Sequence, residues 1–175
     1  MALPGGQRAV QRLVDEHYEA LYRYAYRLSG AADQAADLTQ ETFYKAHAQL
    51  SQLRDPQRAK PWLYSILRNA YLHRARSERQ HRVLPLESVA ELNELPPDPF
   101  PEIEPEKLQA ALNDLPEGFR TPLLLFYFQE FSYRDIAAQM DLPIGTVMSR
   151  LARAKAFLRE RLAPTEARQS GANGL

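Results

Sequence analysis

The sequence contains no cysteine, and that absence removes three classes of protein at once. Disulfide-stapled scaffolds, enzymes with a thiol nucleophile and zinc sites held by thiolates all depend on cysteine. The seven glycines are scattered, so no glycine-rich loop is available to cradle a phosphate. The four histidines lack the spacing of metal ligands, and no serine stands in a nucleophile-elbow context. We therefore expect a protein that is not an enzyme, with no metal and no cofactor.

Long apolar runs are also missing. Nowhere do about 18 apolar residues follow one another, as a membrane span requires, and the first residues lack the apolar core of a secretion signal. We expect a soluble, cytoplasmic protein. Basic and acidic residues balance at 22 each, so bulk charge alone would not attract a polyanion. A nucleic-acid partner would have to be met by local basic patches.

Apolar residues recur at helical spacing through the first half of the chain. A first amphipathic helix is predicted to end near Gly30, and a second is predicted to follow with Asp33 as its cap. The second helix would bury a stripe that includes Leu38 and Phe43. A third helix is predicted from Trp62 to Arg79, preceded by Pro61.

The composition changes between Val83 and Glu106, where the chain has six prolines, seven acidic residues and no basic residue. Proline removes backbone donors and like charges repel, so this stretch is predicted to be an extended, flexible linker. Four further helices are predicted after it, at 106–115, 119–129, 133–140 and 146–162. The predicted fold is all-α, with two small helical domains at 7–82 and 105–163, an acidic proline-rich linker at 83–104 and a disordered tail at 164–175.

Basic residues gather in one element of each predicted domain. Eight lysines or arginines lie between Arg54 and Arg82, against two acidic residues. Five more lie between Arg150 and Arg161, against Glu160 alone. These two elements would offer a polyanion two separate sites on a chain of zero net charge.

The segment from Ser132 to Leu151 has helix-turn-helix patterning. A short helix, a turn and a second helix must pack closely at a steep angle, and the small Ala137 permits that approach. The second helix is predicted to enter the major groove with its N-terminus first. Its side chains toward base edges would be Thr146, Met148, Ser149 and Arg150, and those toward phosphates would be Arg153 and Lys155. A helical hairpin with a solvated basic face is the plainer interpretation of the same pattern.

Three runs in the second half carry a family resemblance: 115–120 (LPEGFR), 131–137 (FSYRDIA) and 143–151 (PIGTVMSRL). They resemble domain four of sigma factors of the extracytoplasmic-function group, in the sigma-70 superfamily. Two runs in the first half, 37–43 (DLTQETF) and 61–69 (PWLYSILRN), resemble domain two of the same group. Together these matches cover about residues 8 to 163.

The resemblance implies a subunit that binds core RNA polymerase and directs promoter-specific transcription initiation. Its partners would be core RNA polymerase, promoter DNA as duplex and as opened strand, and an anti-sigma protein. The residues implied for polymerase binding are Asp37, Gln40, Glu41 and Phe43. Those implied for the minus-ten element are Leu53, Trp62, Arg68, Asn69, Arg74 and Arg76. Domain four would read the minus-thirty-five element through the six residues of the second helix named above.

Other interpretations remain open at this stage. The acidic face of the second helix could be an ordinary solvated surface, and Trp62 could be a core residue. The whole chain could instead be a stand-alone helix-turn-helix regulator with an N-terminal helical sensor domain. A third possibility is an adaptor that binds polymerase without reading DNA. The long acidic linker favours two domains that reach separate sites, since a sensor coupled rigidly to its reader would need a compact join.

Overall fold

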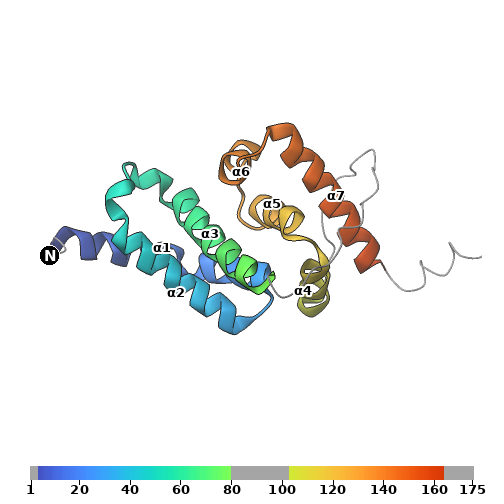
Figure 1. Ribbon diagram of the computed structural model, residues 1–175, viewed down its shortest axis with the longest axis horizontal. Helices are drawn as coiled ribbons and strands as arrows, with labels where there is room; N and C mark the ends of the chain where they lie inside the picture. The colour runs from blue at the N-terminus through green and yellow to red at the C-terminus, as the bar shows by residue number, and fades with distance from the viewer. Residues whose placement is uncertain (1–3, 80–102, 164–175) are drawn as a thin grey trace, which may run out of the picture. The chain divides into compact units, whose positions relative to one another are not determined.

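The computed structural model describes residues 4–79 and 103–163, and within those ranges it is built from α-helices and two short 3-10 turns, without strands. The helices fall into two compact units, one containing α1 to α3 and the other holding most of α4 to α7 (Figure 1). The predicted all-α class with two helical domains is confirmed. The predicted tail lies outside the described residues, as does all but the end of the predicted linker.

Helix α1 spans Pro4–Ser29 and α2 spans Ala32–Ala48. Gly30 separates them with a φ of 77°, a left-handed conformation that glycine adopts without steric cost, and its N–H donates to the Tyr26 carbonyl at 2.8 Å. The predicted end of the first helix is therefore confirmed. The predicted cap of the second is wrong, because Ala31 is the cap residue and Asp33 lies inside the first turn. A carboxylate there still favours the helix through its dipole.

Two 3-10 turns, η1 (Leu50–Gln52) and η2 (Pro56–Arg58), lead into α3 (Ala59–Arg79). The Asp55 carboxylate caps η2 by accepting a hydrogen bond from the Gln57 N–H at 2.9 Å. Pro61 falls in the first turn of α3, where its missing N–H costs nothing. The described part of α3 extends to Arg79, the predicted last residue of this helix.

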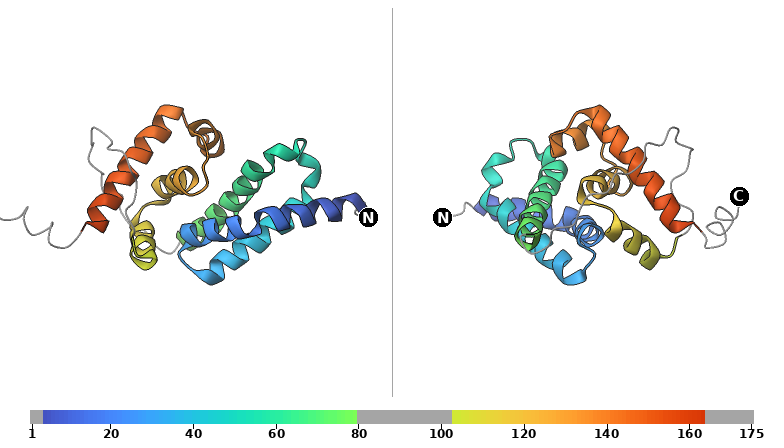
Figure 2. Two further views of the ribbon diagram at one scale, coloured as in Figure 1. Left: turned by 180° about the vertical axis from the view of Figure 1, so that it is seen from behind. Right: turned by 45° about the vertical axis from the view of Figure 1, so that its right-hand side comes forward.

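The N-terminal unit has one apolar core. Helices α1 and α2 pair with each other, and α3 packs against both (Figure 2). The fully buried side chains include Leu21 and Leu28 of α1, Leu38 of α2, and Leu63 and Leu67 of α3. The rings of Tyr24 and Tyr64 lie 5.0 Å apart in a tilted pair, and burial raises the pKa of Tyr64. The buried polar groups Thr39 and Thr42 donate their hydroxyls to helix carbonyls four residues earlier.

The C-terminal unit comprises α4 (Pro105–Asp114), α5 (Glu117–Tyr127), α6 (Tyr133–Met140) and α7 (Ile144–Leu162). Helix α7 packs against α5 and α4. Its core is built from leucines and β-branched residues of all four helices: Leu112, Leu115, Leu123, Leu124, Leu125, Ile136, Val147 and Leu158. All four helices lie within a few residues of their predicted bounds.

The buried Arg120 guanidinium joins the first two helices of this unit. It donates to the Leu115 carbonyl through Nη2 at 2.7 Å and Nε at 3.1 Å, and to the Asn113 carbonyl at 3.2 Å. These bonds satisfy carbonyls at the end of α4 that have no helical donor. Among the described helices, none is both long and apolar enough to cross a bilayer.

Candidate functional site

The outer face of α2 is polar and acidic. Asp37, Gln40, Glu41 and Tyr44 follow one another at helical spacing, so they share one face, opposite the buried Leu38. Asp37, Gln40 and Tyr44 are exposed, and Tyr44 keeps 78% of its surface. We call these four residues the α2 face. It offers a partner one exposed carboxylate, an amide and a phenol ring.

Glu41 differs from its neighbours because two cations hold its carboxylate. Arg74 Nη2 of α3 donates to Glu41 Oε2 at 2.7 Å, and Lys45 Nζ lies 2.7 Å from Glu41 Oε1. The hydrogen bond from Lys45 and that from Arg74 lower the pKa of Glu41, against a smaller opposing effect of burial. The side chains of Arg74 and Glu41 are 38% and 29% exposed. Glu41 therefore stays ionised and ties α2 to α3.

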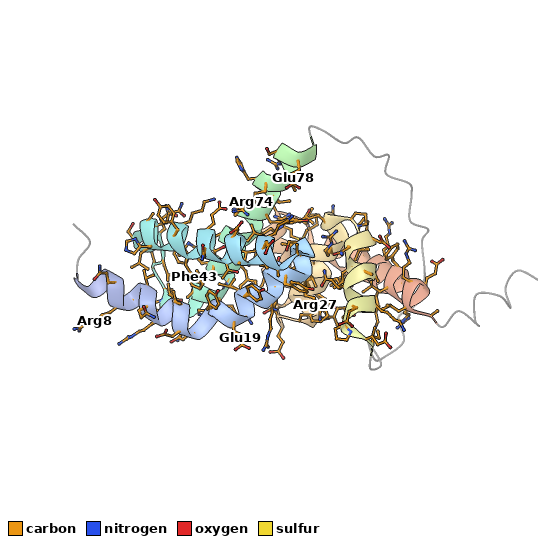
Figure 3. All side chains as sticks on the ribbon, turned by 90° about the horizontal axis from the view of Figure 1, so that it is seen from below. Arg8, Glu19, Arg27, Phe43, Arg74 and Glu78 are labelled. Carbon is orange, nitrogen blue, oxygen red and sulfur yellow. The ribbon has the colours of Figure 1, made fainter. Side chains whose placement is uncertain are left out.

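Phe43 is placed in the core by the structure. It keeps 9% of its surface and stacks on Tyr18 of α1, with ring centroids 6.2 Å apart (Figure 3). A ring this buried packs beneath the surface and offers little area to a partner. The position of Phe43 therefore favours a structural role over direct contact. Tyr18 is 44% exposed and also stacks on Tyr22. Tyr18 is not among the residues predicted for a site, so the sequence analysis missed this exposed aromatic side chain beside Phe43 of α2.

Helix α3 carries most of the residues predicted for the minus-ten element. Trp62, Asn69 and Arg76 follow one another at seven-residue steps, so each lies about 20° from the next and all three share one face. Asn69 and Arg76 are exposed, and Trp62 is half-buried. Arg68 is half-buried on an adjacent face, and Leu53 lies before η2, outside the helix.

Arg74 departs from this set because it points to α2. Figure 3 labels it in the C-terminal part of α3, and its guanidinium is engaged by Glu41. Its carbon stem lies on the side that packs toward α2, and not on the face of Asn69. The structure thus brings a residue predicted for DNA together with one predicted for polymerase binding.

Helix α6 begins and ends with specific backbone bonds. Ser132 and Asp135 form a capping box: the Ser132 hydroxyl accepts from the Asp135 N–H at 3.1 Å, and the Asp135 carboxylate accepts from the Ser132 N–H at 3.3 Å. At the other end Asp141 takes a φ of 53°, and the Leu142 N–H donates to the Ala137 carbonyl at 3.0 Å. This is a Schellman closure, and it turns the chain sharply into α7.

The first turns of α7 present the predicted recognition residues. Met148 is 49% exposed and Ser149 is exposed, with its hydroxyl donating to the Thr146 carbonyl at 3.1 Å. Thr146 and Arg153 are half-buried. Helix-turn-helix geometry of this kind lets the N-terminal turns of the second helix reach base edges.

Two basic residues of α7 are not placed as predicted. Lys155 is 5% exposed, and its ammonium lies 5.8 Å from the centre of the Tyr127 ring. A side chain this buried offers little surface to a phosphate, so the position of Lys155 does not favour the predicted phosphate contact. Arg150 is half-buried, and its Nη1 donates to the Gly118 carbonyl at 3.1 Å.

Within residues 4–79 and 103–163, no three histidine, aspartate or glutamate side chains gather in a way that could hold a metal ion. The described surfaces present one acidic face and two basic helices, which suit recognition of a partner.

Comparison with known proteins matches both units. The family model for "Sigma-70 region 2" matches residues 13–81, and that for "Sigma-70, region 4" matches residues 106–158. The ECF RNA polymerase sigma factor EcfG of Rhodopseudomonas palustris is 35% identical over 139 residues, covering 79% of this chain and 77% of that protein. The ECF RNA polymerase sigma factor SigE of Mycolicibacterium smegmatis is 37% identical over 159 residues. That match covers 86% of this chain, which spans only 60% of the relative.

A solved structure has the same fold. The sigma factor RpoE of Bartonella quintana, in complex with the anti-sigma factor NepR, superposes with a TM-score of 0.72 at 31% identity. The match covers 87% of this chain and 95% of that chain.

Proposed function

This chain belongs to the extracytoplasmic-function group of sigma-70 RNA polymerase sigma factors, and we propose a division of work between its two units. A sigma factor binds core RNA polymerase and directs it to promoters. The N-terminal unit docks on the polymerase and captures the opened minus-ten strand, and the C-terminal unit reads the minus-thirty-five duplex. RNA synthesis itself belongs to the polymerase, and this chain has no reaction of its own. The proposed location of this chain is the bacterial cytoplasm.

The single observation that carries this proposal is the order of the two matches. Region 2 falls on α1 to α3 and region 4 falls on α4 to α7, each covering the helices of one unit. A stand-alone regulator would need the helix-turn-helix match alone. An adaptor that never reads DNA would have no use for it. The paired matches favour the sigma factor over both rivals.

The α2 face is the proposed polymerase dock. Its exposed Asp37, Gln40 and Tyr44 suit a basic, partly aromatic partner surface, where a carboxylate gives orientation and the phenol ring gives buried area. Glu41 contributes at the edge of this face while holding Arg74. Phe43 acts from beneath, by fixing the position of α2 against α1.

The Asn69 face of α3 is the proposed contact with the opened strand. An amide both donates and accepts, so it can pair with the edge of an unstacked base, and the neighbouring Trp62 and Arg76 supply an aromatic face and a positive charge. Arg68 and Leu53 flank this face in the proposal. Arg74 contributes indirectly, through its ion pair with Glu41 of α2.

Helix α7 is the proposed reader of the minus-thirty-five element. Met148 and Ser149 are exposed side chains of its first turns, where apolar contact with a thymine methyl and a hydroxyl contact with a base edge are both available. Thr146 lies near the start of the helix, and Arg153 lies about two turns further along, toward a phosphate. An anti-sigma protein is a proposed further partner, since the RpoE structure holds one.

Footprinting tests the division of work. Core polymerase with this chain, bound to a promoter that it activates, should protect two separate regions upstream of the start site. Reversing the charge of Asp37 should remove both regions, because the polymerase is lost. Replacing Met148 and Ser149 should weaken the upstream region first. Protection of one continuous region by the chain without polymerase would instead favour the stand-alone regulator.

A further inference from the structure

A proline inside α5 leaves one of its carbonyls without a helical donor. Pro122 is the sixth residue of α5 and is buried. In a regular helix the N–H at this position would donate to the carbonyl four residues earlier, which is that of Gly118, but proline has no N–H. The proline ring also crowds that carbonyl and tilts it away from the helix axis. A polar group in this position needs a donor from elsewhere.

Arg150 of α7 is that donor. Its Nη1 lies 3.1 Å from the Gly118 oxygen, and its guanidinium carbon lies 5.9 Å from the centre of the Phe119 ring. The guanidinium fork thus meets a carbonyl and an aromatic face on the same turn of α5. A hydrogen bond from a charged donor is stronger than a neutral one.

The lack of a side chain at Gly118 leaves room for the Arg150 guanidinium beside the Gly118 carbonyl. A Cβ added at this position would lie 3.2 Å from Arg150 Nη1, closer than nine in ten real contacts of a Cβ. A side chain at this position would require the guanidinium to shift by a few tenths of an ångström. Gly118, Pro122 and Arg150 therefore form one device, which we call the α5–α7 clasp.

We propose that Arg150 is a positioning residue that sets the angle of the recognition helix α7 against α5, and that it does not read a base. The inference rests on the proposed function of α7 as the minus-thirty-five reader. Moving the guanidinium to a base edge would leave the Gly118 carbonyl without its charged donor, a cost that each DNA contact would have to offset. Recognition then falls to Met148 and Ser149, whose side chains are exposed on the first turns of the same helix.

A double-mutant cycle in the full-length chain isolates the clasp. Arg150→Met removes the donor while keeping the length of the side chain. Pro122→Ala restores a backbone N–H for Gly118, and Pro122→Val does so with closer volume. Hydrogen exchange of α5 and α7 is the first readout. Arg150→Met should raise exchange of both helices roughly ten-fold, and the same change made with Pro122→Ala or Pro122→Val should raise it much less.

Binding to a minus-thirty-five duplex is the second readout, taken at a temperature where circular dichroism finds every variant fully helical. Arg150→Met should lower affinity evenly across base substitutions, with an unchanged salt slope, and Pro122→Ala should restore much of that affinity. Arg153→Met is the matched control, and it should lower the salt slope by about one.

Three results would overturn the proposal. The first is a shift in preferred base with Arg150→Met that Pro122→Ala does not alter, which would make Arg150 a reader. The second is a fall in its salt slope by about one, which would make it a phosphate contact. The third is an increase in hydrogen exchange caused by Arg150→Met that is equally large with Pro122 present and with Pro122 replaced. If the unmodified chain binds no duplex in any context, the proposed role of α7 fails, while the exchange cycle still decides the clasp.

Discussion

Arg74 of α3 donates to the carboxylate of Glu41 of α2 across 2.7 Å, so the helix proposed for polymerase is joined to the helix proposed for DNA by this ion pair. Lys45 holds the second oxygen of the same carboxylate. One arginine and one lysine thus fix a glutamate that would otherwise add its charge to Asp37, four residues earlier. Like charges at this spacing repel, and the two cations remove that repulsion.

Asp37 and Glu41 should respond differently to charge reversal. Asp37→Lys should leave stability within about 0.5 kcal/mol, because its side chain is exposed, but should strongly weaken binding to core polymerase. Glu41→Lys should weaken binding and also cost about 1 kcal/mol of stability, since it sets three cations together. Thermal unfolding followed by the fluorescence of Trp62, the sole tryptophan, measures the N-terminal unit. Equal stability of the two variants would contradict the role given to the Glu41 pair.

The free energy of unfolding at acid pH should depend on the ionisation of Glu41. Its folded-state pKa lies below the ordinary value of 4.5, so its contribution is present above that value and is lost as pH falls through the folded pKa. Glu41→Gln should be less stable than the unmodified chain at neutral pH, and the gap should close below pH 4.5. Urea unfolding at several pH values gives the difference directly. A constant gap across the range would show that ionisation of Glu41 plays no part.

Lys155 should behave as a core residue. Lys155→Met keeps most of the apolar stem beside Tyr127, so the unfolding free energy should change by no more than about 1 kcal/mol and the salt slope of DNA binding should not change. Lys155→Asp should destabilise the unit severely, because it buries an unpaired charge. Arg153→Met, which removes a proposed phosphate contact, serves as the comparison for the salt slope. A slope reduced by about one in Lys155→Met would restore the phosphate role predicted from the sequence.

Asn69 should matter after docking. Asn69→Ala should reduce promoter opening, read by permanganate reactivity of thymines, while polymerase binding and contact with the minus-thirty-five element stay unchanged. A pre-melted promoter should restore only part of the lost activity, since base capture is lost as well as opening. Unchanged reactivity, with unchanged preference among the four bases, would remove Asn69 from the proposed site.

Helical periodicity was enough to predict the fold. Apolar residues repeating at three- and four-residue steps marked the helices, and Gly30 and Pro61 marked boundaries through their backbone preferences. The predicted phosphate contact of Lys155 gave charge more weight than periodicity. Lys155 falls on the same stripe as Leu151 and Leu158, so the spacing already pointed inward.

Other features depend on tertiary contacts that spacing does not encode. The sequence around Pro122 does not indicate that Arg150 replaces the missing proline N–H as hydrogen-bond donor, because 28 residues separate the two positions. The same holds for Glu41 and Arg74, which are 33 residues apart. The one local sign was a glycine four residues before a helical proline, which indicates an unsatisfied carbonyl but not its partner.

Transcription from a genomic template tests the central claim most directly. Purified core polymerase is mixed with and without this chain, and the 5′ ends of the transcripts are sequenced. The account predicts new start sites that appear only with the chain and share two upstream elements, and it predicts that Asp37→Lys abolishes them. No stimulated initiation on any template, with the chain folded and core polymerase active, would contradict it.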